Sequence, residues 1–429
     1  MNSFKDLRKA TISQVKSMLT QRLSKDESEQ ASFITQLYYQ GYSPRDLAVM
    51  SVDDCYGALL CLWRFIQQRA PGQAKIQAYN PEPEEHHWHS THSVIEILVD
   101  DMPFLVASLL MELDRQELKV HNLNHPVIRT LRNDQGQLAS IGQPAGKQQG
   151  FQSEALMRIE IDRQPDPAAL EKIVSSILTV VEDVRRVVSD WSAMQARLDE
   201  AIQWCRNNPM PAEAEELKET LSFLEWLKTD NFLFIGFRYY DLSKSEQGFQ
   251  SRIQGQSGLG TFREEVRQSS PEQLLPPYLA SRLQEPELLV ITKSTSRSSI
   301  QRPAHLDYLG IKKFDGTGSV VGEWRFFGLF SSTAYTMPLD QVPLIRKKVN
   351  RLLQQSDTPA DSHRGKALRH IIHDYPRDEM LQASYDQLQG AINGILGCQE
   401  RRRLRLFLRP DTYDRFVNVL VYVPRDRFN

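Results

Sequence analysis

The amino-acid sequence predicts a multidomain α+β protein, and three observations support that prediction. The chain has 429 residues, which suggests roughly three domains at about 150 residues each. Residues 92–134 change their hydrophobic period twice, from that of a strand to that of a helix and back again. Residues 231–330 contain several strand-like runs, and apolar residues make up 40% of the chain, which is enough for buried cores.

The first 75 residues are expected to form an N-terminal helical segment. Ser43 before Pro44 is typical of a helix N-cap followed by proline at the first helical position. Ser51 with Asp54 indicates the start of another helix. The apolar side of that helix would consist of Cys55, Leu59, Leu62 and Ile66.

Residues 76–200 are expected to form a domain in which a sheet packs against two helices. The strand-like runs of this sheet are residues 93–99, 119–131 and 155–161, and a short strand-like run at 75–79 lies before the linker 80–83 that leads to them. The helix after the first of the three runs has a predicted apolar face of Met102, Val106, Leu109, Leu110 and Leu113. The long helix after the last run has an apolar stripe of Leu170, Ile173, Val174, Ile177, Val181, Val184 and Val188. The order β-α-β-β-α is that of a split βαβ, ferredoxin-like sandwich.

The loop Asp100-Asp101-Met102-Pro103 is the candidate effector site of this domain. It joins a strand to a helix, and Asp101 suits the N-cap while Pro103 suits the first turn. The backbone N–H groups of a helix N-terminus can hold a carboxylate or another anion. In ferredoxin-like regulatory modules this junction, at a subunit interface, is the usual place for a small effector. An ordinary capped helix start is the alternative interpretation.

Residues 212–340 are expected to form a mostly antiparallel sheet with flanking helices. A helix is predicted over residues 212–228, from the spacing of its leucines. The predicted strands are residues 231–240, 287–292, 306–314 and 320–330. The sequence Asp315-Gly316-Thr317-Gly318 between the last two strands indicates a hairpin turn.

Residues 341–400 are expected to be helical, and residues 401–429 to begin a further sheet. The predicted helices are residues 340–355, 362–374 and 378–396. The final strand-like runs are residues 404–408 and 416–423. Because a strand pair cannot bury a face alone, we expect the chain to be a fragment, or these strands to complete a sheet supplied by other residues.

Composition argues against several functional classes. The net charge is −2, whereas a nucleic-acid-binding chain would carry a basic field. The N-terminus has no apolar signal region, and no window offers the roughly 20 apolar residues of a membrane span. Four cysteines without a CxxC pair indicate a reduced, cytoplasmic protein. The sequence therefore predicts no nucleic-acid partner and no membrane association.

Two residue clusters have some features of a binding site, but we expect neither of them to be one. The histidines, which have no cysteine partner and no HExxH spacing, are His86, His87, His89, His92, His121 and His125. We therefore expect strand-edge histidines and no metal. The glycines Gly255, Gly258 and Gly260 form GxxGxG, whereas a dinucleotide fingerprint needs GxGxxG. A flexible loop is the expected structure there.

A basic run is the second candidate contact region. It consists of Arg401, Arg402, Arg403 and Arg405, and Arg409 follows it. Guanidinium groups bind carboxylates and phosphates through two parallel hydrogen bonds. We favour a strand edge that pairs with acidic residues of a neighbouring domain and so blocks aggregation.

Four segments carry a resemblance to a known family. They are HWHSTHSVIEILVDDMPFLVASLLMELDRQELKVHNLNHPVI, IKKFDGTGSVVGEWRFFGLFSSTAY, PRDEMLQASYDQL and QERRRLRLFLRPDTYDRFVNVLVYVPRDRFN. In this order they resemble the N-terminal region of the large bacterial NAD-specific glutamate dehydrogenases. Ala107 departs from the pattern, since an acidic residue is expected there.

The resemblance implies an enzyme that oxidises L-glutamate to 2-oxoglutarate and ammonia with NAD. It implies an ACT-like domain at 76–200, a PAS-like domain at 212–340 and the start of a second ACT-like domain at 401–429. The catalytic lysine and the dinucleotide fold would lie beyond Asn429, so this chain is expected to hold no catalytic residue and no cofactor. It would be inactive alone.

The resemblance also implies partners. These are the catalytic domain of the same polypeptide, further copies in a homo-oligomer, and an amino-acid effector. The favoured function is therefore regulation and oligomerisation within a glutamate dehydrogenase. The alternative is a stand-alone amino-acid-sensing protein of ACT/PAS type without enzymatic activity.

Overall fold

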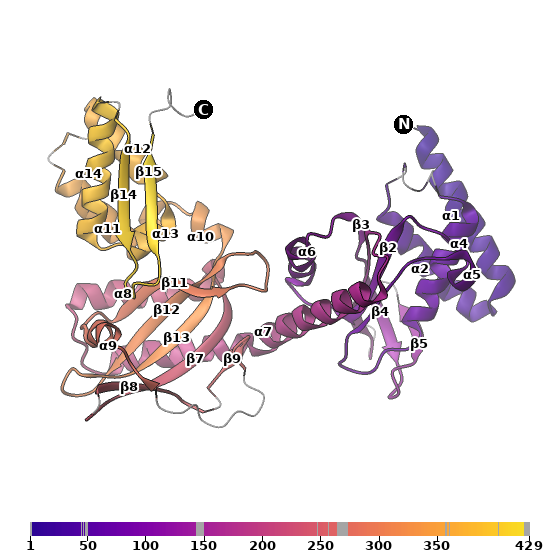
Figure 1. Ribbon diagram of the computed structural model, residues 1–429, viewed down its shortest axis with the longest axis horizontal. Coiled ribbons are helices and arrows are strands. Elements are labelled where there is room, and N and C mark those ends of the chain that lie inside the picture. The colour runs from indigo at the N-terminus through magenta and orange to yellow at the C-terminus, as the bar shows by residue number, and fades with distance from the viewer. Residues whose placement is uncertain are drawn as a thin grey trace. The chain divides into compact units, whose positions relative to one another are not determined.

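The computed structural model describes most of the chain (Figure 1). The described residues are 2–43, 45, 47, 50–142, 150–246, 248–255, 257–263, 273–356, 358–359, 361–401 and 403–423. They form two compact units, residues 1–185 with 299–303, and residues 186–298 with 304–429. The five-segment division expected from the sequence stays a prediction.

Three helices begin the first unit. They are α1 (Asn2–Arg22), α2 (Lys25–Gln40) and α4 (Val52–Ile66). Ser24 and Glu27 form a capping box at the start of α2, and Ser51 caps α4 by accepting a hydrogen bond from the Asp54 N–H, as predicted. The predicted apolar side of α4 is buried. The expected cap at Ser43-Pro44 falls partly outside the described residues.

A six-stranded antiparallel sheet follows, in the spatial order β1-β2-β6-β4-β5, with β3 also paired to β6. The strands are β1 (Lys75–Tyr79), β2 (His92–Asp100), β3 (Val120–Asn124), β4 (Val127–Arg132), β5 (Leu138–Gly142) and β6 (Gln152–Asp162). One face, which includes Leu98, Ile128 and Leu156, shares a core with α1, α2 and α4. Figure 1 shows α6 (Leu105–Arg115) and the start of α7 (Pro167–Asn207) on the other side of this sheet.

The strand order is that of the predicted ferredoxin-like sandwich, with one difference. In a βαββαβ unit the last strand closes the sheet beside the first strand. Here β1, which precedes that unit in the chain, pairs with β2 along five residues and fills the same edge. A short helix, α5 (Pro83–His86), lies between β1 and β2.

Two details of the predicted secondary structure were wrong in this unit. The single strand expected over residues 119–131 is divided into β3 and β4, and both pair with β6. Pro126 lies between them, and it has no backbone N–H to donate a hydrogen bond to a neighbouring strand. Helix α6 begins at Leu105 rather than at Met102. Its buried residues are Leu105, Ser108, Leu109, Glu112 and Leu113, so the predicted face is rotated.

The second unit is built on a seven-stranded antiparallel sheet in the order β10-β8-β7-β13-β12-β11, with β9 paired to β7. The strands are β7 (Phe232–Ser245), β8 (Gly248–Ile253), β9 (Leu259–Gly260), β10 (Gln273–Leu274), β11 (Leu289–Arg297), β12 (His305–Phe314) and β13 (Val320–Phe330). The hairpin turn before β13 is confirmed, and the Asp315 carboxylate accepts hydrogen bonds from the Thr317 and Ser319 N–H groups.

Helices and a strand pair complete the second unit. The helical elements are α8 (Ala214–Trp226), η1 (Leu227–Asn231), α9 (Pro277–Gln284), α10 (Ser332–Thr336), η2 (Leu339–Gln341), α11 (Ile345–Gln354), α12 (His363–Asp374), α13 (Arg377–Gln382) and α14 (Tyr385–Arg401). The single helix predicted over residues 378–396 is divided into two helices. The backbone of Ala383 is extended, and the Ser384 hydroxyl accepts a hydrogen bond from the Gln387 N–H where the second helix begins. Strands β14 (Arg405–Pro410) and β15 (Val417–Tyr422) pair as predicted.

Candidate functional site

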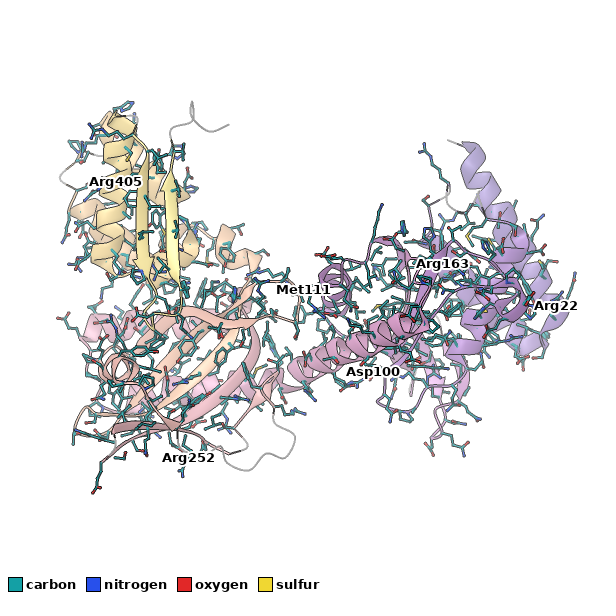
Figure 2. The ribbon with its side chains drawn as sticks, viewed as in Figure 1. Arg22, Asp100, Met111, Arg163, Arg252 and Arg405 are labelled. Carbon is teal, nitrogen blue, oxygen red and sulfur yellow. The ribbon has the colours of Figure 1, made fainter. Side chains whose placement is uncertain are left out.

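The predicted effector loop begins in a partly buried network of charges. Asp100, labelled in Figure 2, ends β2. Its carboxylate accepts a hydrogen bond from the guanidinium of Arg69, a residue that is 3% exposed. The Arg185 Nη2 lies 4.0 Å from the other carboxylate oxygen. The carboxylate of Asp100 is therefore held by cations of the same unit.

Glu154 extends the network across the sheet, since β6 pairs it directly with Asp100. Its carboxylate is fully buried and accepts from Arg132 Nε and Nη2, both at 2.8 Å, while Arg69 Nη1 lies at 3.1 Å. Arg132 also donates to the carbonyl oxygens of Ile66 and Gly136. Two arginines thus satisfy two carboxylates and bind the end of α4 to the sheet. Removing Glu154 would leave the Arg132 guanidinium without its carboxylate partner.

The rest of the loop forms an uncapped helix start. The Asp101 N–H donates to the Ser153 carbonyl at 3.0 Å, and its side chain is exposed. The N-cap is Phe104, whose φ of 68° is in the left-handed region and whose side chain accepts no hydrogen bond. The prediction of Asp101 as N-cap was therefore wrong. The N-cap side chain of α6 makes no hydrogen bond to the first turn, and N–H groups at such a helix start are a typical place for an anion.

The predicted basic run is separated by the structure. The side chains of Arg401 and Arg402 lie outside the described residues, and Arg403 and Arg405 are exposed. The Arg405 guanidinium lies 5.4 Å from the centre of the Phe407 ring (Figure 2 labels Arg405 on β14). Arg409, further along β14, is buried and donates to both carboxylate oxygens of Glu379. The paired guanidinium is thus Arg409 and not a member of the run.

The histidines do not converge. The rings of His92 and His121 lie 4.2 Å apart, His121 Nε2 lies 2.6 Å from the Asp162 carboxylate, and His86 stacks on Tyr79. Within the described residues no group of three or more histidine, cysteine or carboxylate side chains is placed to hold a metal.

The glycine motif is a packed turn. The Gly260 N–H donates to Asp190 Oδ2 at 2.8 Å, and a Cβ at Gly260 would lie 2.2 Å from the Ile235 carbonyl. Gly260 has a φ of 62°, which favours glycine. The expected flexible loop is therefore wrong at this end of the motif, where the glycine fits a tight approach to β7.

A charged core that the sequence analysis missed lies between β2, β6 and α2. Arg158 is 2% exposed and its guanidinium stacks over the rings of Trp88 at 4.5 Å and Tyr38 at 5.4 Å. The carboxylates of Glu96 and Glu160 lie 3.7 and 3.8 Å away. Burial raises the pKa of the Glu96 carboxyl. In the sequence Glu96 is a charged residue within an apolar strand, which is a signal for a buried charge. Its partners lie on other elements, so the sequence could not identify them.

A cavity of about 900 Å³ in the second unit was also missed. Its walls come from α8, α9, β11, α11, the α13–α14 junction and the β14–β15 turn. At its base Lys348 Nζ donates to the carbonyl oxygens of Met380, Leu381 and Ala383 at 2.8–3.1 Å, and burial lowers the pKa of Lys348 to about 8. No sequence signal could reveal it, because six separate elements form it.

Comparisons with known proteins agree with this architecture. The family model described as glutamate dehydrogenase, ACT1 domain, matches residues 33–177. Those for glutamate dehydrogenase, helical motif 1, and glutamate dehydrogenase, ACT2 domain, match residues 342–401 and 405–429. None of the described helices is long and apolar enough to cross a membrane.

Three curated relatives carry the name NAD-specific glutamate dehydrogenase. The Halomonas elongata protein is 37% identical over 97% of this chain, and the Pseudomonas aeruginosa protein is 34% identical over 97%. The Mycobacterium tuberculosis protein is 26% identical over 85%. The chain spans 26% of the length of the first two relatives and 21% of the third.

Proposed function

Because this chain belongs to the NAD-specific glutamate dehydrogenase family and matches the N-terminal portion of its members, we propose that it is their regulatory and oligomer-forming region. The observation that carries the proposal is the order of the matches, an ACT1 domain, helical motif 1 and an ACT2 domain, within one chain. A stand-alone sensor is not favoured, since the two relatives at 97% coverage of this chain are much longer polypeptides.

In this proposal the oxidation of L-glutamate to 2-oxoglutarate and ammonia, with reduction of NAD, is performed by the longer polypeptide in the cytoplasm. Residues 1–429 contribute no catalytic residue. The glycine motif is assigned no dinucleotide, because the Gly260 N–H donates to Asp190 of α7 and Gly260 packs against the Ile235 carbonyl of β7. NAD would bind outside these residues, at the catalytic domain of the same polypeptide.

We assign a PAS-like fold to residues 212–340 and a second ACT-like domain to the segment that starts with β14. The support for the second assignment is one apolar face of the β14–β15 pair. Each residue of that face is at least 50% exposed. The residues are Leu404, Leu406, Leu408, Val417, Val419 and Val421. Further strands or helices of the longer polypeptide would cover it.

We place the effector at the loop Asp100-Asp101-Met102-Pro103. The uncapped N–H groups of α6 would hold the carboxylate of an amino acid, and the exposed Asp101 carboxylate would hold its ammonium group. The residues of the charge network at Asp100 would keep the loop in place.

Thermal-shift measurements with single amino acids test the regulatory role. An effector at about one hundred times its Kd should stabilise the chain by roughly 2.7 kcal/mol. Asp101→Ala should abolish that shift, whereas Asp114→Ala, an exposed carboxylate at the other end of α6, should leave it unchanged. An equal shift in both variants would contradict the assignment, and a monomeric mass in sedimentation would contradict oligomer formation.

A further inference from the structure

A fully buried carboxylate lies in the sheet of the second unit. It belongs to Asp307 of β12, whose ladder partner on the edge strand β11 is Lys293. The Lys293 Nζ lies 2.5 Å from Asp307 Oδ1, and the Phe330 N–H of β13 donates to Asp307 Oδ2 at 3.4 Å. A buried carboxylate stays ionised only where cations and hydrogen-bond donors replace the water it has lost. Lys293 is therefore the main support of the Asp307 charge.

The same ammonium group also holds a second carboxylate, which comes from helix α13. The Lys293 Nζ lies 3.0 Å from Asp378 Oδ2. The Tyr335 hydroxyl of α10 donates to the other oxygen, Asp378 Oδ1, at 2.7 Å. Lys293 thus joins the edge of the sheet to the start of α13. We call Lys293, Asp307 and Asp378 the charge latch.

The charge latch carries one positive and two negative charges when all three groups are ionised. Lys293 is the one cation among the described residues that reaches either carboxylate. Arg377, the neighbour of Asp378 in sequence, donates to the Met337 carbonyl instead. Burial raises the pKa of the Asp307 carboxyl to about 6, the Lys293 ammonium opposes that rise, and the Asp378 carboxylate adds to it. One proton on Asp307 would remove the excess negative charge.

Other titratable groups near α13 have partners of their own. Lys348 of α11 donates to two carbonyl groups of α13, and burial lowers the pKa of Lys348 to about 8. Glu379 of α13 forms an ion pair with Arg409. His305, two residues before Asp307 on β12, is exposed, and its Nδ1 lies 3.2 Å from a backbone carbonyl oxygen of β11. Substitution of Asp307 alone leaves all of these groups in place, and Lys348 keeps its proton below pH 7.

We propose that the charge latch is a pH-sensitive switch, which holds α13 against the sheet more firmly when Asp307 is protonated. With Asp307 neutral, the Lys293 ammonium group serves Asp378 alone and no excess charge remains. With Asp307 ionised, two carboxylates compete for one ammonium group, and their repulsion favours release of α13. Helix α13 belongs to the segment that matches helical motif 1, so the switch would make the attachment of that segment depend on pH. This proposal does not rest on the function proposed above.

Amide hydrogen exchange in peptides that cover α13 tests the proposal in the complete polypeptide. Opening of the latch exposes Asp307 to water, where the pKa of an aspartic acid is about 4. Since the pKa is about 6 in the closed latch, the equilibrium constant for opening should fall roughly tenfold from pH 7 to pH 5. We expect protection of α13 to rise by that factor, after correction for intrinsic exchange rates. A rise of less than about twofold would overturn the proposal.

Two aspartate substitutions assign the effect to the latch. Asp307→Asn has no carboxyl to titrate, so its protection of α13 should differ by less than about twofold between pH 7 and pH 5. Asp386→Asn, which removes an exposed carboxylate from the neighbouring helix α14, should keep the roughly tenfold rise. A rise that persists in Asp307→Asn would refute the switch, because His305 and Lys348 remain in that variant.

Asp378→Asn keeps the proposal testable if Asp307→Asn does not fold. Loss of the second carboxylate should lower the pKa of Asp307, because the Asp378 charge contributes to its rise. The rise in protection from pH 7 to pH 5 should then shrink to less than about threefold. An undiminished rise in Asp378→Asn would show that the two carboxylates do not compete for Lys293, and would contradict the switch.

Discussion

The guanidinium of Arg409 on β14 holds the carboxylate of Glu379 on α13 through two hydrogen bonds, Nε to Oε2 at 2.7 Å and Nη2 to Oε1 at 2.6 Å. Both residues are buried, at 8% and 5% exposure. A buried pair of this geometry joins the terminal strand pair to the helical segment before it. The fork of arginine matches a carboxylate in a way that lysine cannot.

Breaking this pair should destabilise the second unit. We expect Arg409→Ala to lower the free energy of unfolding by about 3–5 kcal/mol, because Glu379 would remain as an unpaired buried charge. Arg405→Ala, at an exposed position of the same strand, should cost at most about 0.5 kcal/mol. Chemical denaturation followed by circular dichroism measures both. Equal effects would contradict the role of the pair.

The three helix starts make a second prediction. Ser51→Ala and Ser362→Ala should each cost about 1 kcal/mol, because each hydroxyl accepts a hydrogen bond from a backbone N–H at a helix start. Asp101→Ala should cost less than about 0.5 kcal/mol, because Phe104 and not Asp101 occupies the N-cap of α6. Thermal unfolding of the three variants decides the matter. A loss of stability in Asp101→Ala as large as in Ser51→Ala would contradict this, and would support Asp101 as the N-cap.

Much of the fold follows from local signals of this kind. The cap at Ser51, the hairpin turn at Asp315 and the strands β12 and β13 were predicted from neighbours in sequence, and the structure confirms them. Strand β8 was missed because Gly248–Ile253 is short and has only a weak apolar pattern. The shift at Phe104 was missed because a left-handed φ in a phenylalanine has no sequence signature.

The candidate sites were harder to predict, for a physical reason. The loop at Asp100 could be located because a strand and a helix meet there. Its partners Arg69 and Arg132 lie on other elements, so the charge network depends on tertiary contacts. The cavity beside β11 likewise depends on which strand lies at the sheet edge, and so on tertiary structure.

Glu96 gives a prediction about pH. Its carboxyl is fully buried and accepts from Gln77 and Tyr79, and burial raises its pKa above the ordinary value of a glutamic acid. The folded state therefore holds this proton more tightly than the unfolded state, so the stability it contributes at low pH is lost as the pH rises through the folded pKa. We expect the wild type to lose stability relative to Glu96→Gln between pH 4 and 8. A constant difference across that range would contradict the shift.

The exposed apolar face of the β14–β15 pair gives a prediction that depends on chain length. In the 429-residue chain, Leu406→Ser with Val419→Ser should change the free energy of unfolding by less than about 1 kcal/mol, since the side chains are 50% and 57% exposed. In the complete polypeptide the same pair should cost at least about 3 kcal/mol, because a covered face would lose core contacts. Equal costs in the two proteins would refute a covering segment.

The central claim is that residues 1–429 regulate and assemble an enzyme whose chemistry takes place elsewhere in the polypeptide. The most direct measurement is the rate of NADH formation from L-glutamate and NAD, followed by absorbance, for the 429-residue chain and for the complete polypeptide at equal molar concentration. We predict turnover by the complete polypeptide and a rate equal to the protein-free blank for the 429-residue chain. NADH formation by the 429-residue chain above that blank would contradict the account.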